Sequence, residues 1–167
     1  PYRRQRQMCI RDSRYPGADE DVLSHISFET KPGETTAFIG STGSGKSTLV
    51  KLMNRFYDVS RGSIEINGVD IRKYDLESLR SQIGYVAQKA HMFKGSIQSN
   101  ICFGKPEASV EEMVHAATVA QASDFISTRE HGYEDEIAED GTNISGGQKQ
   151  RLSIARVILK KPSLYIY

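Results

Sequence analysis

Short apolar runs rich in β-formers alternate along this chain with segments whose apolar residues recur every three or four positions. The runs predict a strand at residues 22–29 and buried strands at residues 36–39, 83–86 and 163–167. The helical periodicity predicts helices at residues 45–57, 76–81, 96–103, 109–120, 122–128 and 145–160. Strands that alternate with helices are typical of an α/β protein with a parallel sheet.

Local signals sharpen the boundaries of some of these elements. Residues 62–71 read as a hairpin, because two β-rich runs flank Asn67-Gly68, the dipeptide that best supplies two positive φ angles. This hairpin predicts a small antiparallel sheet beside the parallel one. Ser109 with Glu112 has the spacing of a helical capping box. Pro162 predicts the end of the last helix near residue 160.

Residues 1–13 show neither strand alternation nor helical periodicity. We therefore assign no element to them, and we expect a linker or a segment foreign to the rest of the chain. Packing of this segment as a regular central strand with buried alternate residues would contradict that expectation.

The clearest chemical motif is the segment Gly-Ser-Thr-Gly-Ser-Gly-Lys-Ser-Thr at residues 40–48. It fits the pattern G-x-x-x-x-G-K-[ST] of a phosphate-binding loop, and it lies between a predicted strand and a predicted helix, as that motif requires. Glycines let the backbone curl and approach a phosphate closely. Successive N–H groups and the following helix start then favour an anion. The loop predicts nucleotide binding, with Lys46 on the β- and γ-phosphates and Ser47 on Mg²⁺.

Two further positions have a functional and an ordinary interpretation. Gln88 follows a predicted strand at the edge where α/β sheets place ligand-binding groups, and glutamine can ligate a metal or orient a water; it also fits an ordinary polar loop. Tyr15 could stack on adenine or be a plain core or surface aromatic. Sequence context within the chain leaves both alternatives open.

The segment Ile-Ser-Gly-Gly-Gln at residues 144–148 is the second chemical motif. Ser145 and Gln148 have capping-box spacing, so a helix should begin there. Each of the two glycines weakens the first helical turn by roughly 1 kcal/mol relative to alanine. The two glycines are explained if the backbone must come close to an anion. The alternative is a helix start that is weakened by glycine and has no binding role.

Composition and charge limit the class of protein. The chain has 167 residues, 38% hydrophobic and 26% charged, as in a soluble globular domain. No apolar run is long enough to span a membrane, and none resembles a signal peptide.

A net charge of +1 does not favour binding of nucleic acid. The arginines of residues 1–14 fit a solvated or non-native end, or a contact with anionic lipid or RNA. Cys9 and Cys102 lack metal-ligand spacing, which favours reduced thiols in cytosol.

Taken together, the loop at residues 40–48, Gln88 after a strand and residues 144–148 before a helix resemble the nucleotide-binding domain of ATP-binding cassette (ABC) transporters. They occur in that family's order and approximate spacing over residues 14–167. Residues 14–17 and the Glu-rich loop before the signature look most like multidrug or lipid exporters. The resemblance implies a P-loop NTPase-like α/β fold: a mostly parallel sheet flanked by helices, a small antiparallel β subdomain, and a helical subdomain at about residues 89–160 that carries the signature.

The same resemblance implies ATP and Mg²⁺ as ligands. Lys46 and Gln88 would be the catalytic residues, Ser47 and Gln88 would ligate Mg²⁺, and Tyr15 would stack on adenine. The implied nucleotide-binding set is Tyr15, Gly40, Ser41, Thr42, Gly43, Ser44, Gly45, Lys46, Ser47, Thr48, Gln88, Ser145, Gly146, Gly147 and Gln148.

The resemblance also implies partners and a location. Ser145, Gly146 and Gly147 would contact the γ-phosphate of ATP held by a second nucleotide-binding domain, in a head-to-tail homodimer or heterodimer. Coupling helices of a transmembrane domain would be the other partner, at the cytoplasmic face of a membrane. Ile144 replaces the family's commoner leucine, which is a mild apolar change.

Two departures from the family pattern affect the expected activity. Residues 1–13 stand where the family has its first strand. The family's Mg²⁺-binding aspartate, its water-polarising glutamate and its γ-phosphate histidine would come after Tyr167, so they cannot be read in these 167 residues. We therefore expect the 167-residue chain to bind ATP·Mg weakly and to hydrolyse it negligibly. Sustained turnover that Lys46→Ala abolishes would contradict this.

For the intact protein, the leading hypothesis is ATP hydrolysis that powers export. The alternatives are a degenerate partner subunit that clamps ATP without hydrolysing it, and a soluble ABC ATPase of DNA repair or translation. A glutamate after the Mg²⁺-binding aspartate would favour hydrolysis over clamping. Long inserts or tandem cassettes without upstream membrane helices would favour the soluble protein.

Overall fold

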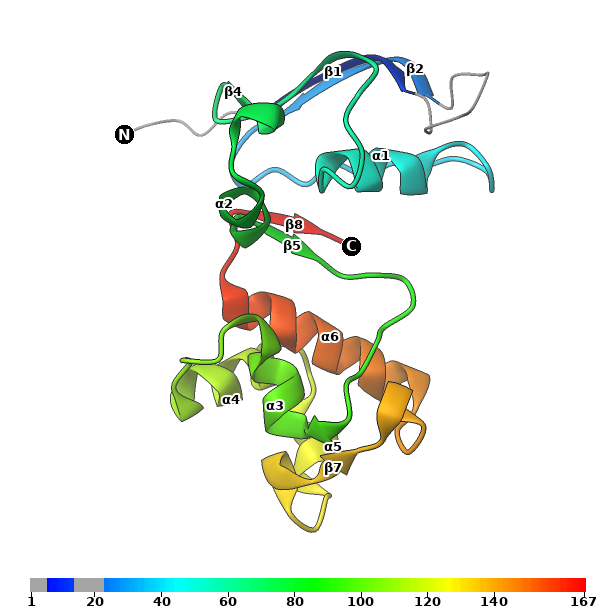
Figure 1. The fold of residues 1–167 in the computed structure, drawn as a ribbon. Coiled ribbons are helices and arrows are strands. Elements are labelled where there is room, and N and C mark those ends of the chain that lie inside the picture. Colours follow the sequence, from blue (N-terminus) through cyan, green and yellow to red (C-terminus); the bar gives the residue numbers. More distant parts are fainter. Residues whose placement is uncertain (1–5, 14–22) are drawn as a thin grey trace. The chain divides into compact units, whose positions relative to one another are not determined.

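The computed structural model describes residues 6–13 and 23–167 of the chain (Figure 1). The chain folds into two compact units, and it passes from the first to the second between Arg80 and Ser81. Among the residues described, no helix combines the length and the apolar character needed to cross a bilayer.

The first unit is built on a four-stranded antiparallel sheet with the strand order β2-β1-β3-β4. Along β2, the half-buried Ile26, Phe28 and Thr30 alternate with exposed residues. One face of this strand is therefore packed and the other faces solvent. The strands are β1 (Arg6–Ser13), β2 (Leu23–Thr30), β3 (Arg61–Ile66) and β4 (Val69–Asp70).

Strand β1 corrects the expectation for the start of the chain. It pairs with β2 on one side and β3 on the other, so that Cys9 lies opposite both Ser27 and Ser63. The backbone of Arg6–Ser13 is thus a central strand and not a linker. The hydrogen bonds of a ladder come from the backbone and from strands distant in sequence, so the local pattern could not reveal them. The other domain limits given above stay a prediction.

The predicted hairpin is confirmed between β3 and β4. Ile66 pairs with Val69 across a two-residue turn. Asn67 has a φ of 56° and Gly68 a φ of 74°, the two positive angles that the favoured hairpin turn needs.

Helix α1 (Lys46–Met53) begins where the sequence predicts but ends earlier than residue 57. Arg55 adopts a left-handed φ of 50°. The N–H of Phe56 donates to the carbonyl of Lys51 at 2.9 Å, and the N–H of Arg55 donates to that of Leu52 at 3.0 Å. This is the helix-ending geometry that usually carries glycine at the left-handed position. Arginine there gave no sequence signal for the stop.

The strand predicted at residues 36–39 is not formed. Ile39 is 97% exposed and Phe38 is 40% exposed, where a buried strand was expected. The ring of Phe38 meets that of Phe28 on β2 edge-on, with centroids 4.9 Å apart. A strand needs a neighbour to supply ladder hydrogen bonds, and among the described residues no strand pairs with this segment.

The second unit contains the parallel pair β5 (Ile83–Tyr85) and β8 (Leu164–Ile166), which confirms both predicted strands. Gly84 lies opposite Tyr165. A Cβ at Gly84 would lie 2.5 Å from Cγ1 of Val157 and 2.6 Å from Cγ of Pro162. Glycine is therefore needed where this strand approaches the end of α6 so closely.

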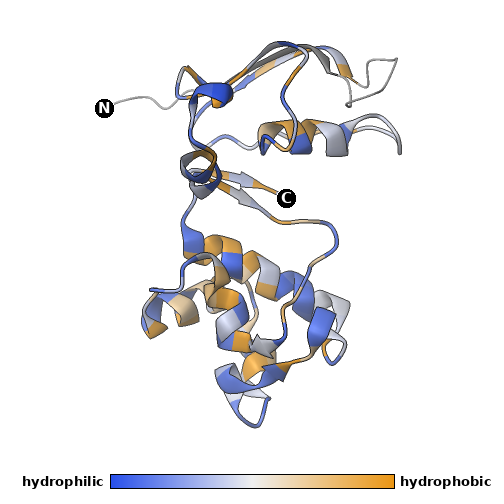
Figure 2. Ribbon diagram, in the orientation of Figure 1, coloured by the Kyte–Doolittle hydropathy of each residue, from blue (hydrophilic) through white to orange (hydrophobic). Residues whose placement is uncertain are grey.

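Helices and the short antiparallel pair of β6 (Gly95–Ser96) and β7 (Glu136–Ile137) follow in the second unit, and the predicted helices are confirmed with boundaries shifted by a few residues. Helix α6 carries hydrophobic and hydrophilic residues in alternating bands (Figure 2), as an amphipathic helix does. Before this unit, the short 3₁₀ helix η1 (Ile71–Lys73) and helix α2 (Leu76–Ser81) follow β4. The elements after β5 are β6 (Gly95–Ser96), α3 (Ile97–Ile101), η2 (Cys102–Gly104), α4 (Val110–Val119), α5 (Ser123–Ser127), η3 (Gly132–Glu134), β7 (Glu136–Ile137), η4 (Glu139–Gly141) and α6 (Gly146–Lys160).

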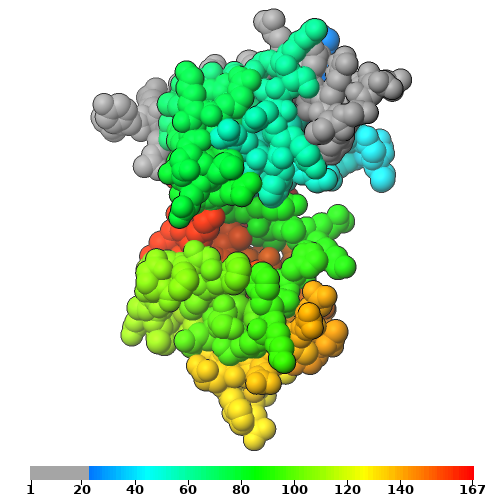
Figure 3. Space-filling model, in the orientation of Figure 1, coloured from blue at the N-terminus to red at the C-terminus, as the bar shows by residue number. Residues whose placement is uncertain are grey.

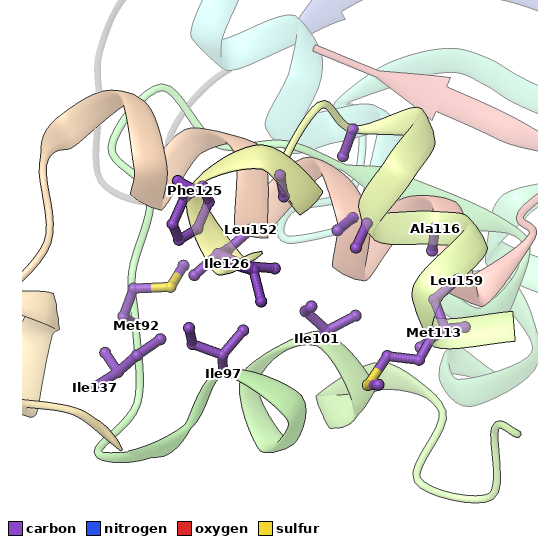
Figure 4. Close-up of a cluster of buried hydrophobic side chains, with 14 of the residues drawn as sticks. Met92, Ile97, Ile101, Met113, Ala116, Phe125, Ile126, Ile137, Leu152 and Leu159 are labelled. Atoms are coloured by element: carbon purple, nitrogen blue, oxygen red, sulfur yellow. The ribbon is translucent and has the colours of Figure 1, made fainter. Parts of the chain in front are cut away.

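One hydrophobic core holds these helices together. In Figure 4 the side chains of α3, α4, α5 and α6 point toward one another, joined by Met92 from the segment before β6 and by Ile137 of β7. Leu152 of α6 and Ile101 of α3 are both completely buried. The buried members of this cluster run from Met92 to Leu159.

Glu112 ties three segments of this unit together. Its carboxylate accepts hydrogen bonds from Lys105 Nζ at 2.9 and 2.8 Å and from Lys161 Nζ at 2.7 Å. It also completes the predicted capping box with Ser109 at the start of α4. The two ammonium groups, that of Lys105 first, lower the pKa of Glu112 from 4.5 to about 2.

This pKa predicts how the stability of the second unit depends on pH. The carboxyl titrates near 4.5 in the unfolded chain and near 2 in the folded one. Its contribution is therefore complete above pH 4.5 and is lost as the pH falls toward 2. Glu112→Gln should make the urea midpoint less sensitive to pH between 2 and 5, measured by circular dichroism. Equal pH slopes for the two proteins would contradict the prediction.

Candidate functional site

The glycine-rich loop at residues 40–48 curls around the amino group of its own lysine. Lys46 Nζ donates to the carbonyl of Gly40 at 2.6 Å, to that of Ser41 at 2.8 Å and to Ser44 Oγ at 3.1 Å. The lysine therefore lies inside the curve that the loop carbonyls and hydroxyl outline. A mobile side chain on an open turn would not hold three such contacts.

The glycines are required by the backbone of this loop. Gly43 has a φ of 86°, and Gly45, the residue that caps α1, has a φ of 85°. Other residues rarely adopt such angles. A Cβ at Gly40 would lie 2.6 Å from Ser44 Oγ and 3.2 Å from Ser44 Cβ, so the Ser44 side chain would have to move. The sequence pattern and the geometry thus agree at all three glycines.

The loop presents its groups to solvent at the start of α1. Residues 40–44 and Ser47 are exposed, whereas Thr48 is buried and packs into the unit. The first N–H groups of a helix have no partner within the helix. An exposed turn of amides, a cation and a hydroxyl can bind a phosphate chain.

Gln88 is the predicted residue that follows a parallel strand. It lies three residues after β5, outside any helix or strand, and it is exposed. This agrees with the predicted position in a loop at the carboxyl end of that strand. The described residues hold no group of three or more His, Cys, Asp or Glu side chains that could bind a metal ion.

The signature at residues 144–148 opens α6 with the predicted capping box. Ser145 Oγ accepts from the N–H of Gln148 at 3.2 Å, and Gln148 Oε1 accepts from the N–H of Ser145 at 3.0 Å. Ser145, Gly146 and Gly147 are exposed. The segment around residue 140, orange in Figure 3, lies at the surface of this unit.

The two signature glycines have no internal reason to be glycine. A Cβ at Gly146 or Gly147 would meet nothing within 4 Å, and neither residue has a positive φ. Alanine at each would strengthen the helix by roughly 1 kcal/mol. The surface at the start of α6 is therefore open and free of side chains at these two positions.

The predicted residues are divided between the two units. The loop at residues 40–48 belongs to the first unit, and Gln88 and the signature belong to the second. Tyr15 lies outside the described residues. Sequence analysis did not single out Asn143 and Lys149, whose side chains hold the loop before the signature. Their contacts lie five to nine residues away, so no short spacing signals them.

Comparisons with known proteins fit this pair of motifs. The chain is 48% identical over 153 residues to a putative multidrug export ATP-binding/permease protein, YgaD, of Bacillus subtilis, covering 92% of this chain and 26% of that protein. It is 43% identical over 153 residues to the ATP-dependent lipid A-core flippase of Vibrio vulnificus, covering 91% and 26%. The chain thus spans about a quarter of the length of these relatives.

A solved structure shows the same fold. The structure of a bacterial Atm1-family ABC exporter with ATP bound superposes with a TM-score of 0.92 and 38% identity, covering 98% of this chain and 28% of that one. This likeness places the chain in the P-loop NTPase-like α/β fold of ABC exporters. The family model for ABC transporters matches residues 23–167, and the chain therefore belongs to the ABC transporter family.

Proposed function

We propose that this chain is the ATP-binding part of an ABC exporter, and that ATP hydrolysis in the intact protein powers export across a membrane. The observation that carries the proposal is the glycine loop closed around Lys46 at the start of α1. The names of the relatives, a multidrug export protein and a lipid A-core flippase, support export.

The residues present fit ATP and Mg²⁺. The amides of residues 40–48 and the charge of Lys46 suit the phosphates. Ser47 Oγ and Gln88 Oε1 are hard oxygens, the kind of ligand that Mg²⁺ prefers. Tyr15 is proposed to stack on the adenine ring. ATP bound here would supply a γ-phosphoryl group for transfer to water. The role of this chain is to bind and orient it, with Lys46 and Gln88 as the catalytic residues proposed.

The signature supports a partner of the same kind. Exposed glycines at a helix start, without an internal reason for being glycine, suit close contact with a phosphate. We therefore propose that Ser145, Gly146 and Gly147 act on ATP held by a second nucleotide-binding domain arranged head-to-tail. A transmembrane domain, contacted through its coupling helices, completes the proposed assembly and would place this chain on the cytoplasmic face of the membrane.

Nucleotide protection of the 167-residue chain tests the proposal. ATP with Mg²⁺ at about a hundred times its Kd should stabilise the chain by about 2.7 kcal/mol, measured as a higher urea midpoint. Adenosine, which lacks the phosphates that the loop binds, serves as the matched control and should give a much smaller shift. Hydrolysis by this chain alone should be negligible. Equal shifts with ATP and adenosine would contradict phosphate recognition by the loop.

A further inference from the structure

The loop before the signature, residues 136–143, is braced by the side chain of Asn143. Asn143 Nδ2 donates to the carbonyl of Glu136 at 2.8 Å, and Asn143 Oδ1 accepts from the N–H of Ala138 at 2.9 Å. Both ends of the carboxamide are thus paired with the backbone, as a neighbouring strand would pair with it. These two hydrogen bonds hold the loop at Asn143, the residue directly before the signature.

Lys149 holds the same loop from the other side of the signature. It lies in the first turns of α6, and its Nζ donates to the carbonyl of Asp140 at 2.7 Å. Asp140 has a left-handed φ of 53°, so its carbonyl takes an unusual direction, toward the lysine. A Cβ at Gly141 would lie 3.0 Å from Lys149 Cε and 3.1 Å from Met92 Cγ. The loop is therefore pressed close to the lysine stem.

The first residue of the signature, Ile144, is anchored in the hydrophobic core of the second unit. It is only 8% exposed and belongs to the core of the second unit, and its N–H donates to the carbonyl of Gly141 at 3.1 Å. Ser145, Gly146 and Gly147 stay exposed between this anchor and Lys149. Two glycines make this turn conformationally costly to order. Contacts that order it in advance remove that cost from ligand binding.

From this arrangement we infer that Asn143 and Lys149 are positioning residues for the signature: they hold the first-turn amides of α6 in the direction that the γ-phosphate of the partner's ATP requires. The inference rests on the proposed function of the signature. Neither side chain needs to touch the nucleotide. Each acts on the backbone that bears Ser145 and the two glycines.

Amide hydrogen exchange of the 167-residue chain tests the local effect. The N–H of Lys149, bonded to the carbonyl of Ser145, is the reporter. The N–H of Met113, bonded in the same way behind the capping box of α4, is a matched control in the same unit. Asn143→Ala should speed exchange at Lys149 about fivefold or more, because two hydrogen bonds are lost, and leave Met113 unchanged. Equal acceleration at both amides would mean general destabilisation and would overturn the inference.

ATP hydrolysis by the full-length protein that carries this chain tests the functional effect. Asn143→Ala and Lys149→Met should each lower kcat/KM about fivefold to tenfold. Lys149→Arg, which keeps a donor for the Asp140 carbonyl, should recover at least half of the activity. Binding of ATP to the 167-residue chain should stay within about twofold of the unchanged protein, because the phosphate loop is intact.

Gly146→Val in the same hydrolysis assay separates this inference from the proposed function. If Gly146→Val lowers the rate and Asn143→Ala does not, the signature acts as proposed and the positioning role is wrong. If Gly146→Val has no effect, the signature does not contact nucleotide, and both ideas fail. A loss in both variants together with rescue by Lys149→Arg supports the inference.

Discussion

Lys46→Ala should weaken the binding of ATP·Mg to the 167-residue chain about tenfold to a hundredfold. The substitution removes the loop's only cation, and a hydrogen bond to a charged group contributes about 1.5–3 kcal/mol, which corresponds to that range of Kd. The side chain now rests on the carbonyls of Gly40 and Ser41, so it is already inside the curve that the phosphates would enter. Isothermal titration calorimetry measures the change.

Lys73→Ala is the matched control for this experiment. Lys73 lies in η1 of the same unit and is exposed, so the net charge changes equally while the loop stays intact. Its Kd for ATP should stay within about twofold of the unchanged chain, since screened distant charges contribute little. Equal losses in the two variants would show that the lysine acts through general charge, and not through the phosphate loop.

Leu152→Ala should cost the second unit about 2–5 kcal/mol of unfolding free energy. Leu152 is completely buried in the middle of α6, within the cluster shared with α3, α4 and α5 (Figure 4). Its truncation removes apolar contacts and leaves a cavity that the neighbouring helices can fill only in part. Because domains are stable by about 5–15 kcal/mol in total, the urea midpoint of the helical signal should fall sharply.

Leu76→Ala makes the same chemical change at an exposed site. Leu76 begins α2 and is 42% exposed, so its truncation should change the urea midpoint far less, within about 0.5 kcal/mol in free energy. Circular dichroism follows both variants. A loss at Leu76 as large as that at Leu152 would contradict the position of the core.

Elements fixed by contacts within a few residues could be predicted from the sequence. The capping boxes at Ser109 and Ser145 appear with both of their hydrogen bonds. The Asn67-Gly68 turn has its two positive φ angles. In the loop at residues 40–48, Gly43 and Gly45 have the positive φ angles that glycine favours. In each case the partners of a group lie within about four residues, so the spacing of residue types carries the information.

Elements that depend on distant partners could not be predicted in this way. Strand β1 exists because β2 and β3 lie on its two sides, although its own residues show no alternation. Residues 36–39 have a strand-like composition but no paired neighbour among the described residues. Arg55 ends α1 in a left-handed conformation, and its guanidinium also donates to the carbonyls of Ile71 and Tyr74, well over ten residues away.

For the candidate site, the sequence by itself determined which residues bear the chemistry: Lys46 and its glycines, and the capped helix start at Ser145. Local backbone preferences and side-chain types suffice for that. Only the tertiary structure decided that Lys46 lies against the carbonyls of its own loop, and that Asn143 and Lys149 hold the signature from both ends. Those contacts depend on how the chain folds back on itself, because a hydrogen bond forms only where folding brings donor and acceptor within about 3 Å.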